Sequence, residues 1–186
     1  MFLSTTTHPW RFRTRSGSVE PVPDTPPPTD FERMDVLGET PVPATNIEAC
    51  LPDGFQLGGG VGIYGGAGAL LVGGEAFAWR PWAVRPDVTR RLVNEKGQWE
   101  APEEAWGLLG LVWPRPDLLI IGTGAEIRPI SPTTRKHISG LGIRVDVLDT
   151  RNAAAQFNLL ATERGVTDVA AALIPIGRTE GRRPVP

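Results

Sequence analysis

Few residues in this 186-residue chain could do chemistry by themselves. Cys50 is the only cysteine, which excludes an intramolecular disulfide and a zinc site built from cysteines. His8 and His137 are the only histidines. His137 follows Arg135 and Lys136 in a short expected helix, where a solvated face is a simpler interpretation than a catalytic base. Because no paired nucleophile and base can be assembled, the inventory favours a binding or scaffolding protein.

Two short polar segments form the best candidate ligand site. Gly122-Thr123-Gly124 directly follows an apolar run, and Asp149, Thr150 and Asn152 follow the next such run. In sheets with parallel strands, ligands bind beyond the carboxyl ends of the strands. An acid at Asp149 would also stand near the place where a dinucleotide-binding protein holds the ribose. These two loops could therefore hold a nucleotide or another cofactor.

The glycine pattern is nevertheless incomplete as a nucleotide-binding motif. Ile127 occupies the third glycine position, and the next helix is expected only at Pro132, so no helix N-terminus would face a pyrophosphate. The only lysines, Lys96 and Lys136, do not follow a glycine loop. We interpret the two loops as a tight turn and a helix cap, and we expect no cofactor and no metal. An α/β enzyme that binds a nucleotide or cofactor through the Gly122 and Asp149 loops stays as the alternative.

Tryptophan is concentrated in one part of the chain. Five of the six tryptophans fall within 35 residues, namely Trp79, Trp82, Trp99, Trp106 and Trp113. Core packing accounts for some of them, since large aromatic side chains are usually buried. Aromatic anchors also carry much of the energy of protein interfaces. We therefore expect at least one of these five side chains to be exposed and to contact a partner protein.

The hydrophobic pattern predicts the elements that would position these residues. Residues 69–72 and 75–79 are typical of a β-hairpin that turns at Gly73-Gly74. A helix is expected over residues 102–113, because Pro102 and two acids suit a first helical turn and Pro114 suits its end.

Three further apolar runs, over residues 117–121, 143–147 and 169–174, predict strands. A helix that opens at Ser131-Pro132 and one that is capped by Asp149 or Thr150 are expected between them. The short joints force the three strands to pair in parallel. The predicted fold class is α/β: a single compact domain whose mixed β-sheet contains a parallel β-α-β-α-β half, with helices packed on it, preceded by a disordered N-terminal tail.

Charge is balanced overall, with 19 Lys and Arg against 21 Asp and Glu, which argues against nucleic acid as a partner. The start of the chain differs, because residues 1–20 hold three arginines, which suits either a mitochondrial transit peptide or a simply disordered terminus. Residues 21–50 are expected to be a proline-rich acidic linker, residues 51–176 the domain, and residues 177–186 a disordered tail.

Several motifs occur together in a fixed order. They are Pro116-Asp117-Leu118-Leu119-Ile120-Ile121-Gly122-Thr123-Gly124, Gly142-Ile143, Val147-Leu148-Asp149-Thr150-Arg151-Asn152-Ala153, Phe157-Asn158 and Val169-Ala170-Ala171-Ala172-Leu173-Ile174-Pro175. With these motifs, residues 54–176 resemble the mitochondrial complex I assembly factor 3 family and its small bacterial and archaeal relatives of unknown function. The sequence departs from the family at Gln156, where a threonine is expected, and in the segment around Trp99 and the proline-rich linker, which look like additions.

The resemblance implies a domain with a mixed β-sheet, no established enzymatic activity, and a location on the matrix side of the mitochondrial inner membrane. It implies a role early in the assembly of NADH:ubiquinone oxidoreductase, with complex I assembly factor 4 and subunits of the quinone-binding arm as partners. Peripheral contact with the membrane would be compatible with that role. We therefore predict a non-enzymatic, chaperone-like assembly factor that works through protein–protein contacts.

Overall fold

A computed structural model describes residues 43–84 and 91–178 of the chain. All of them belong to one compact unit, Thr40–Pro186. The expected transit peptide and disordered N-terminal tail lie outside the described residues, as do most of the linker and residues 179–186.

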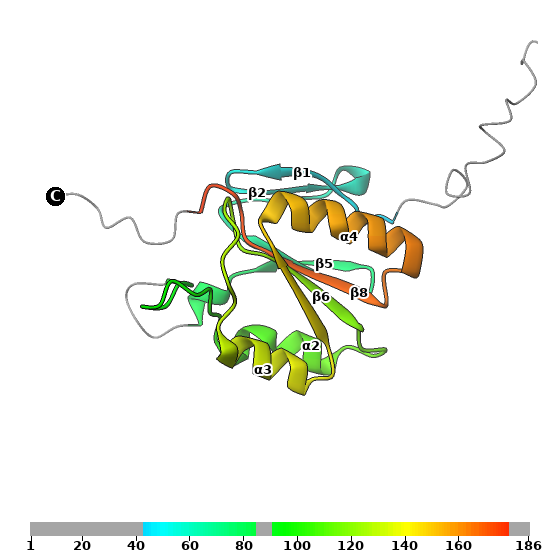
Figure 1. Cartoon of the computed structure of the whole chain (residues 1–186). Coiled ribbons are helices and arrows are strands. Elements are labelled where there is room, and N and C mark those ends of the chain that lie inside the picture. Colours follow the sequence, from blue (N-terminus) through cyan, green and yellow to red (C-terminus); the bar gives the residue numbers. More distant parts are fainter. Residues whose placement is uncertain (1–42, 85–90, 179–186) are drawn as a thin grey trace, which may run out of the picture. The chain divides into compact units, whose positions relative to one another are not determined.

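A five-stranded mixed sheet forms the centre of this unit (Figure 1). Its strands are β4 (Gly68–Val72), β5 (Glu75–Trp79), β6 (Leu118–Gly122), β7 (Arg144–Leu148) and β8 (Val169–Leu173), in the order β5-β4-β8-β6-β7. β6 pairs in parallel with β7 and β8, whereas β4 pairs antiparallel with β5 and β8. This confirms the α/β class and the parallel half of the mixed sheet.

The helices between the parallel strands begin where the sequence predicts. α3 (Pro132–Gly140) joins β6 to β7, and α4 (Thr150–Arg164) joins β7 to β8. The Ser131 hydroxyl caps α3 by accepting a hydrogen bond from the Thr134 N–H. Gly165, with φ at 101°, ends α4, because a residue with a side chain rarely adopts that backbone conformation.

The helix expected over residues 102–113 is shorter than predicted. A 3-10 turn, η3 (Glu103–Trp106), leads into α2 (Gly107–Leu111), and Val112 is already extended. Pro114 disfavours a helical backbone at the residue before it, so the helix ends early. As a result, Trp113 stands on the loop after α2 and not on a helix face.

A second, three-stranded antiparallel sheet lies beside α4 (Figure 1). It contains β1 (Ile47–Leu51), β2 (Gly54–Leu57) and β3 (Gly62–Ile63), with a short 3-10 turn η1 (Gly58–Gly60) between the last two. β1 starts before the expected domain boundary at residue 51, because the Ile47 side chain is buried in the core. The domain therefore begins inside the stretch that we assigned to the linker.

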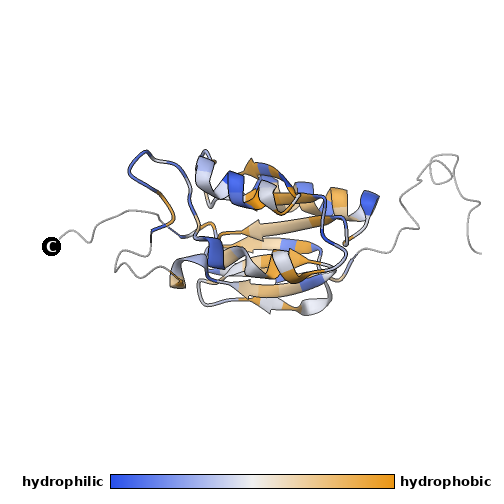
Figure 2. Ribbon diagram, turned by 90° about the horizontal axis from the view of Figure 1, so that it is seen from below, coloured by the Kyte–Doolittle hydropathy of each residue, from blue (hydrophilic) through white to orange (hydrophobic). Residues whose placement is uncertain are grey.

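Apolar residues fill both faces of the five-stranded sheet, whose strands lie toward the hydrophobic end of the scale in Figure 2. On one face, α4 and the three-stranded sheet close a core that includes Phe55, Ile120 and Phe157. On the other face, α2, α3 and a 3-10 turn, η2 (Pro81–Ala83), close a core that includes Trp99 and Leu119. The five-stranded sheet is therefore covered by a packed layer on each face, and these two layers fix the positions of its strand ends.

Candidate functional site

The two polar loops predicted to lie together do meet at the carboxyl edge of the sheet. β6 and β7 are parallel neighbours, and Gly122 stands opposite Leu148 in their register. The Thr123 N–H donates a hydrogen bond of 3.0 Å to the Leu148 carbonyl. Gly122-Thr123-Gly124 and Asp149 therefore lie at adjacent strand ends, as expected.

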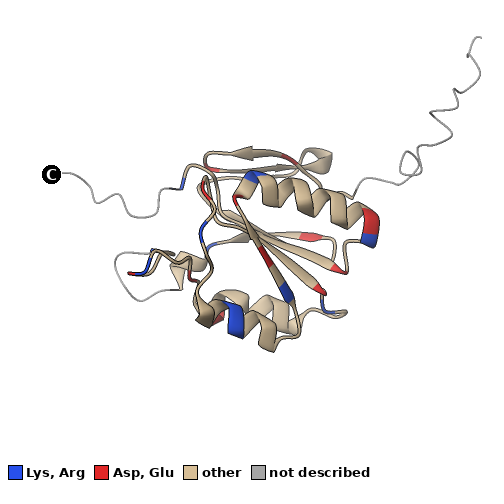
Figure 3. Ribbon diagram, viewed as in Figure 1, with Lys and Arg blue, Asp and Glu red and all other residues tan. Residues whose placement is uncertain are grey.

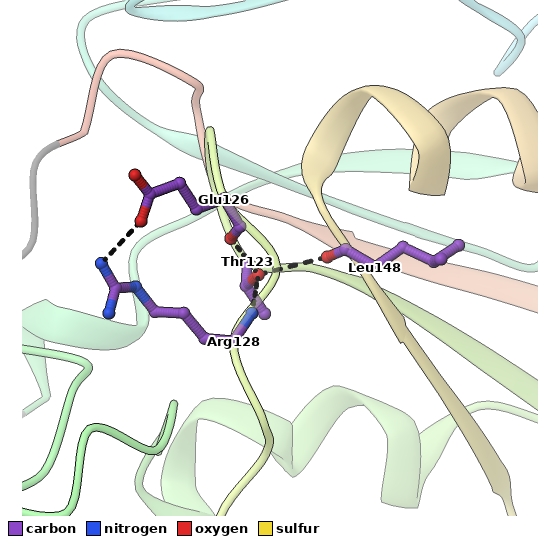
Figure 4. Close-up of polar contacts among 4 residues, drawn as sticks. All are labelled: Thr123, Glu126, Arg128 and Leu148. Atoms are coloured by element: carbon purple, nitrogen blue, oxygen red, sulfur yellow. Dashed lines mark hydrogen bonds and ion pairs between the residues drawn. The ribbon is translucent and has the colours of Figure 1, made fainter.

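The Thr123 hydroxyl is the centre of the first loop (Figure 4). It lies 2.7 Å from the Glu126 carbonyl and 3.2 Å from the Leu148 carbonyl, and it accepts a hydrogen bond from the Arg128 N–H at 3.1 Å. The side chains of Glu126 and Arg128 form an ion pair of 3.3 Å on the outside of the loop. Because Thr123 is buried, this hydroxyl holds the loop closed and is not presented to a ligand.

Thr150 ties together the ends of three strands. Its hydroxyl donates to the Ile174 carbonyl at 2.6 Å and accepts from the Gly124 N–H at 3.0 Å. Its own N–H donates to the Gly124 carbonyl at 2.9 Å. Thr150 is completely buried, and a buried hydroxyl that lacked these bonds would be costly. Thr150 therefore connects the loops that follow β6, β7 and β8 through hydrogen bonds.

The two glycines of the first loop are required for different reasons. A Cβ at Gly122 would lie 2.8 Å from Leu173 Cδ2 and 2.9 Å from the Thr150 backbone, which is closer than packing allows. Gly124 has φ at 106°, a conformation that side chains disfavour. Both glycines are explained by local packing and backbone geometry.

Asp149 caps α4 and completes the second loop. Its Oδ1 accepts hydrogen bonds from the N–H groups of Arg151 at 3.1 Å and Asn152 at 3.2 Å, and the Asn152 side chain donates to its other carboxylate oxygen. Partial burial tends to raise the pKa of Asp149, but the hydrogen bonds from Asn152 and Arg151 outweigh it and lower that pKa. The carboxylate is thus held by its own helix.

These contacts favour the interpretation of the loops as a turn and a cap. The hydroxyls of Thr123 and Thr150 and the carboxylate of Asp149 are all bonded to neighbouring protein groups. An anion at the start of α4 would have to displace Asp149 from two of the N–H groups there. Within residues 43–84 and 91–178, no group of three or more His, Cys, Asp and Glu side chains could hold a metal.

Four of the five tryptophans considered as partner contacts are buried, so only Trp113 meets the expectation of an exposed side chain. Trp79, Trp99 and Trp106 pack together with ring centroids 5.1–6.4 Å apart, and the Trp79 indole N–H donates to the Ala105 carbonyl. Trp82 is also buried, and the Arg178 guanidinium lies 3.7 Å from the centroid of its ring. These four side chains build the core and cannot form a surface for a partner.

Of the five tryptophans, Trp113 is the one whose side chain is exposed and could contact a partner. It is 88% exposed, and Leu111 is 83% exposed, while Val112 between them packs against the core. The Arg115 guanidinium donates to the Leu141 carbonyl at 2.8 Å and reaches the Gly110 carbonyl at 3.5 Å, which ties the loop to α2 and to the end of α3. We call Leu111 and Trp113 the apolar ridge.

Two side chains make contacts that the sequence did not predict. Asn158 follows Phe157 in the sequence, and its side chain forms hydrogen bonds with the backbone of Ile47 in β1. His137, expected on a solvated face, is half-buried and lies 3.7 Å from the Glu103 carboxylate of η3. Neither role has a local signal, because each depends on an element distant in sequence.

The fold and surface define a class: a small α/β domain with strand-end loops that bond to one another and an exposed apolar ridge. None of the helices within the described ranges has the length and apolar character needed to cross a membrane. Residues 47–174 match the family model described as "Protein of unknown function (DUF498/DUF598)". The chain belongs to this family, and the resemblance identified from the sequence is confirmed.

Similar proteins include two that are named NADH dehydrogenase (ubiquinone) 1 alpha subcomplex assembly factor 3. The one from Xenopus tropicalis is 42% identical over 72 residues, which cover 39% of this chain and 38% of that protein. The one from Danio rerio is 39% identical over 112 residues, which cover 60% of this chain and 62% of that protein. Each alignment therefore spans less than two thirds of the relative.

A solved structure of a Rhodopseudomonas palustris protein shares the fold. It is 25% identical, superposes with a TM-score of 0.53, and covers 81% of this chain and 100% of its own.

Proposed function

We propose that this protein is a non-enzymatic assembly factor for mitochondrial complex I that works through protein–protein contacts early in assembly. The names of its relatives support a role in complex I assembly. Its site of action is the matrix side of the inner membrane, reached by import through residues 1–20. Its partners are complex I assembly factor 4 and subunits of the quinone-binding arm.

The observation that carries this proposal is the contrast between the polar loops and the apolar ridge. At the carboxyl edge of the sheet, the side chains of Thr123, Asp149 and Thr150 form hydrogen bonds with backbone groups of the protein. At the ridge, Leu111 and Trp113 keep large apolar side chains in water. The surface is thus better suited to burying apolar area against a protein than to binding a small polar substrate.

The loop that carries the ridge is held in place before any partner binds. Val112 anchors its centre in the core, and Arg115 bonds carbonyls of Gly110 and Leu141 on either side. Little conformational entropy is then lost from this backbone on binding, so more of the energy of burying Trp113 contributes to affinity. An aromatic side chain in such a position typically contributes about 2 kcal/mol or more to an interface.

The test is capture of the proposed partners by ridge variants in mitochondria of the source organism. Leu111→Ser and Trp113→Ser should melt like the wild type, because both side chains are exposed. Each should lose most of its co-purification with complex I assembly factor 4 and the quinone-arm subunits. Ile127→Ser is the matched control, since Ile127 is 61% exposed on a loop away from the ridge. Wild-type capture by both ridge variants would rule out this interface.

A further inference from the structure

β5 is a free edge of the five-stranded sheet. It pairs with β4 from Glu75 to Trp79, and no described strand lies on its other side. Phe77 is 41% exposed there, and Ala78 is exposed as well. The backbone on the outer side of an edge strand is a template for pairing with another strand.

The opposite edge of the sheet is protected in a way that β5 is not. β7 carries the exposed charges Arg144 and Asp146 (Figure 3), and the Gln156 side chain donates to the Asp146 carboxylate at 3.0 Å. Charged side chains on an edge strand oppose edge-to-edge pairing. No charged residue and no proline stands between Glu75 and Arg80 on β5. Only one of the two edges is therefore suited to accept a strand.

The centre of β5 is symmetric in sequence about Phe77. Ala76 and Ala78 flank Phe77, with Glu75 at one end and Arg80 just past the other. If two copies pair antiparallel about a two-fold axis at Phe77, the two phenylalanines face each other and each Ala76 faces an Ala78. Each Glu75 then stands opposite the Trp79 of the other copy, at the ends of the pairing.

We propose that two copies of this chain form a symmetric dimer by antiparallel pairing of their β5 strands about Phe77. The two five-stranded sheets then form one continuous sheet. The ridge of Leu111 and Trp113 belongs to a different loop, so the dimer and the assembly role can each hold without the other. We choose a second copy over an unrelated strand because Ala76 and Ala78 are symmetric about Phe77, so that the centre of β5 can face itself.

Sedimentation velocity of the full chain across a wide range of concentration tests this directly. The wild type should sediment as a reversible dimer. Phe77→Lys and Phe77→Glu each place like charges directly opposite one another and should raise the dimer dissociation constant by about tenfold or more. An equimolar mixture of these two variants should associate again as a heterodimer, because the opposing charges then attract. Leu159→Lys, at an exposed position on α4, is the matched control and should dimerise like the wild type.

Three results would overturn the proposal. The wild type could sediment as a monomer at every concentration. Both Phe77 variants could dimerise as tightly as the wild type, which would place the contact elsewhere. The mixture of the two variants could stay monomeric, which would exclude the two-fold register at Phe77. Thermal melts of both variants accompany the measurement, because a partly exposed Phe77 should tolerate substitution without unfolding.

Discussion

Asn158 on α4 makes both backbone hydrogen bonds of Ile47 on β1. Its Oδ1 accepts from the Ile47 N–H at 2.8 Å, and its Nδ2 donates to the Ile47 carbonyl at 2.9 Å. A side-chain amide thus takes the place of a neighbouring strand and fixes the three-stranded sheet to the helix that covers the central sheet. This contact explains why a polar residue stands beside Phe157 on the packed side of α4.

Asn158→Ala should lower the free energy of unfolding by about 1–3 kcal/mol, because it leaves two backbone groups of Ile47 without partners. Asn158→Asp should also destabilise, since a carboxylate keeps the acceptor but loses the donor to the Ile47 carbonyl. Chemical denaturation measures both changes, with Glu163→Ala, at an exposed position on the same helix, as the control. Hydrogen exchange should become faster first in β1. Wild-type stability of Asn158→Ala would show that other contacts hold β1.

Asp149→Ala should destabilise α4 by about 0.5–2 kcal/mol through loss of its cap. The pH dependence has a defined sign. The pKa of Asp149 is lowered in the folded state, so its stabilising effect is present above the unfolded pKa of about 3.9 and is lost as the pH falls through the lower folded pKa. Asp149→Asn keeps a capping group but cannot titrate. Melting curves of wild type and Asp149→Asn should therefore converge in acid, and an unchanged difference from neutral to acid pH would contradict this assignment.

Gly122→Val should lower the free energy of unfolding by about 1 kcal/mol or more, because a Cβ there meets Leu173 and Thr150. Gly124→Val should cost a similar amount through its positive φ. Gly110→Ala is the control, because a Cβ there has open space and suits a helix.

Calorimetric titration with NAD(H), FAD, S-adenosylmethionine and ATP should show no binding to the wild type. A Gly122 variant that kept its melting temperature and lost a specific small-molecule affinity would favour the cofactor-binding alternative.

The parallel half of the sheet could be predicted from sequence because its signals are local. Residues 118–121 are continuously apolar, as expected of a strand buried on both faces, and Ser131 and Asp149 carry recognisable caps. The three-stranded sheet has no such signal, since β2 and β3 are short and interrupted by glycines.

The sequence could predict where the candidate site lies in the fold, but it could not predict the hydrogen bonds within the site. Parallel strands bring the loops at Gly122 and Asp149 together, yet the bonds that use up the Thr123 and Thr150 hydroxyls depend on exact loop geometry. The tryptophans illustrate the same limit. Helical spacing placed Trp106 and Trp113 on one helix, but Pro114 ends that helix and leaves one ring buried and the other exposed.

Replacing Arg11, Arg13 and Arg15 together should leave the protein in the cytosol, because a positively charged leader without acids is what mitochondrial import requires. These residues lie outside the described part of the chain, and a thermal melt of the triple variant serves as the control for folding. Fractionation of cells and import into isolated mitochondria measure the effect. Unchanged import of the triple variant would remove the basis for the targeting proposal.

The abundance of assembled NADH:ubiquinone oxidoreductase after deletion of the gene tests the central claim most directly. The proposal predicts that the assembled enzyme falls while its subunits are still translated, and that re-expression of the wild-type chain restores it. Trp113→Ser should restore it poorly, whereas the Ile127→Ser control should restore it fully. Full abundance of the assembled enzyme without the gene would contradict the assembly role.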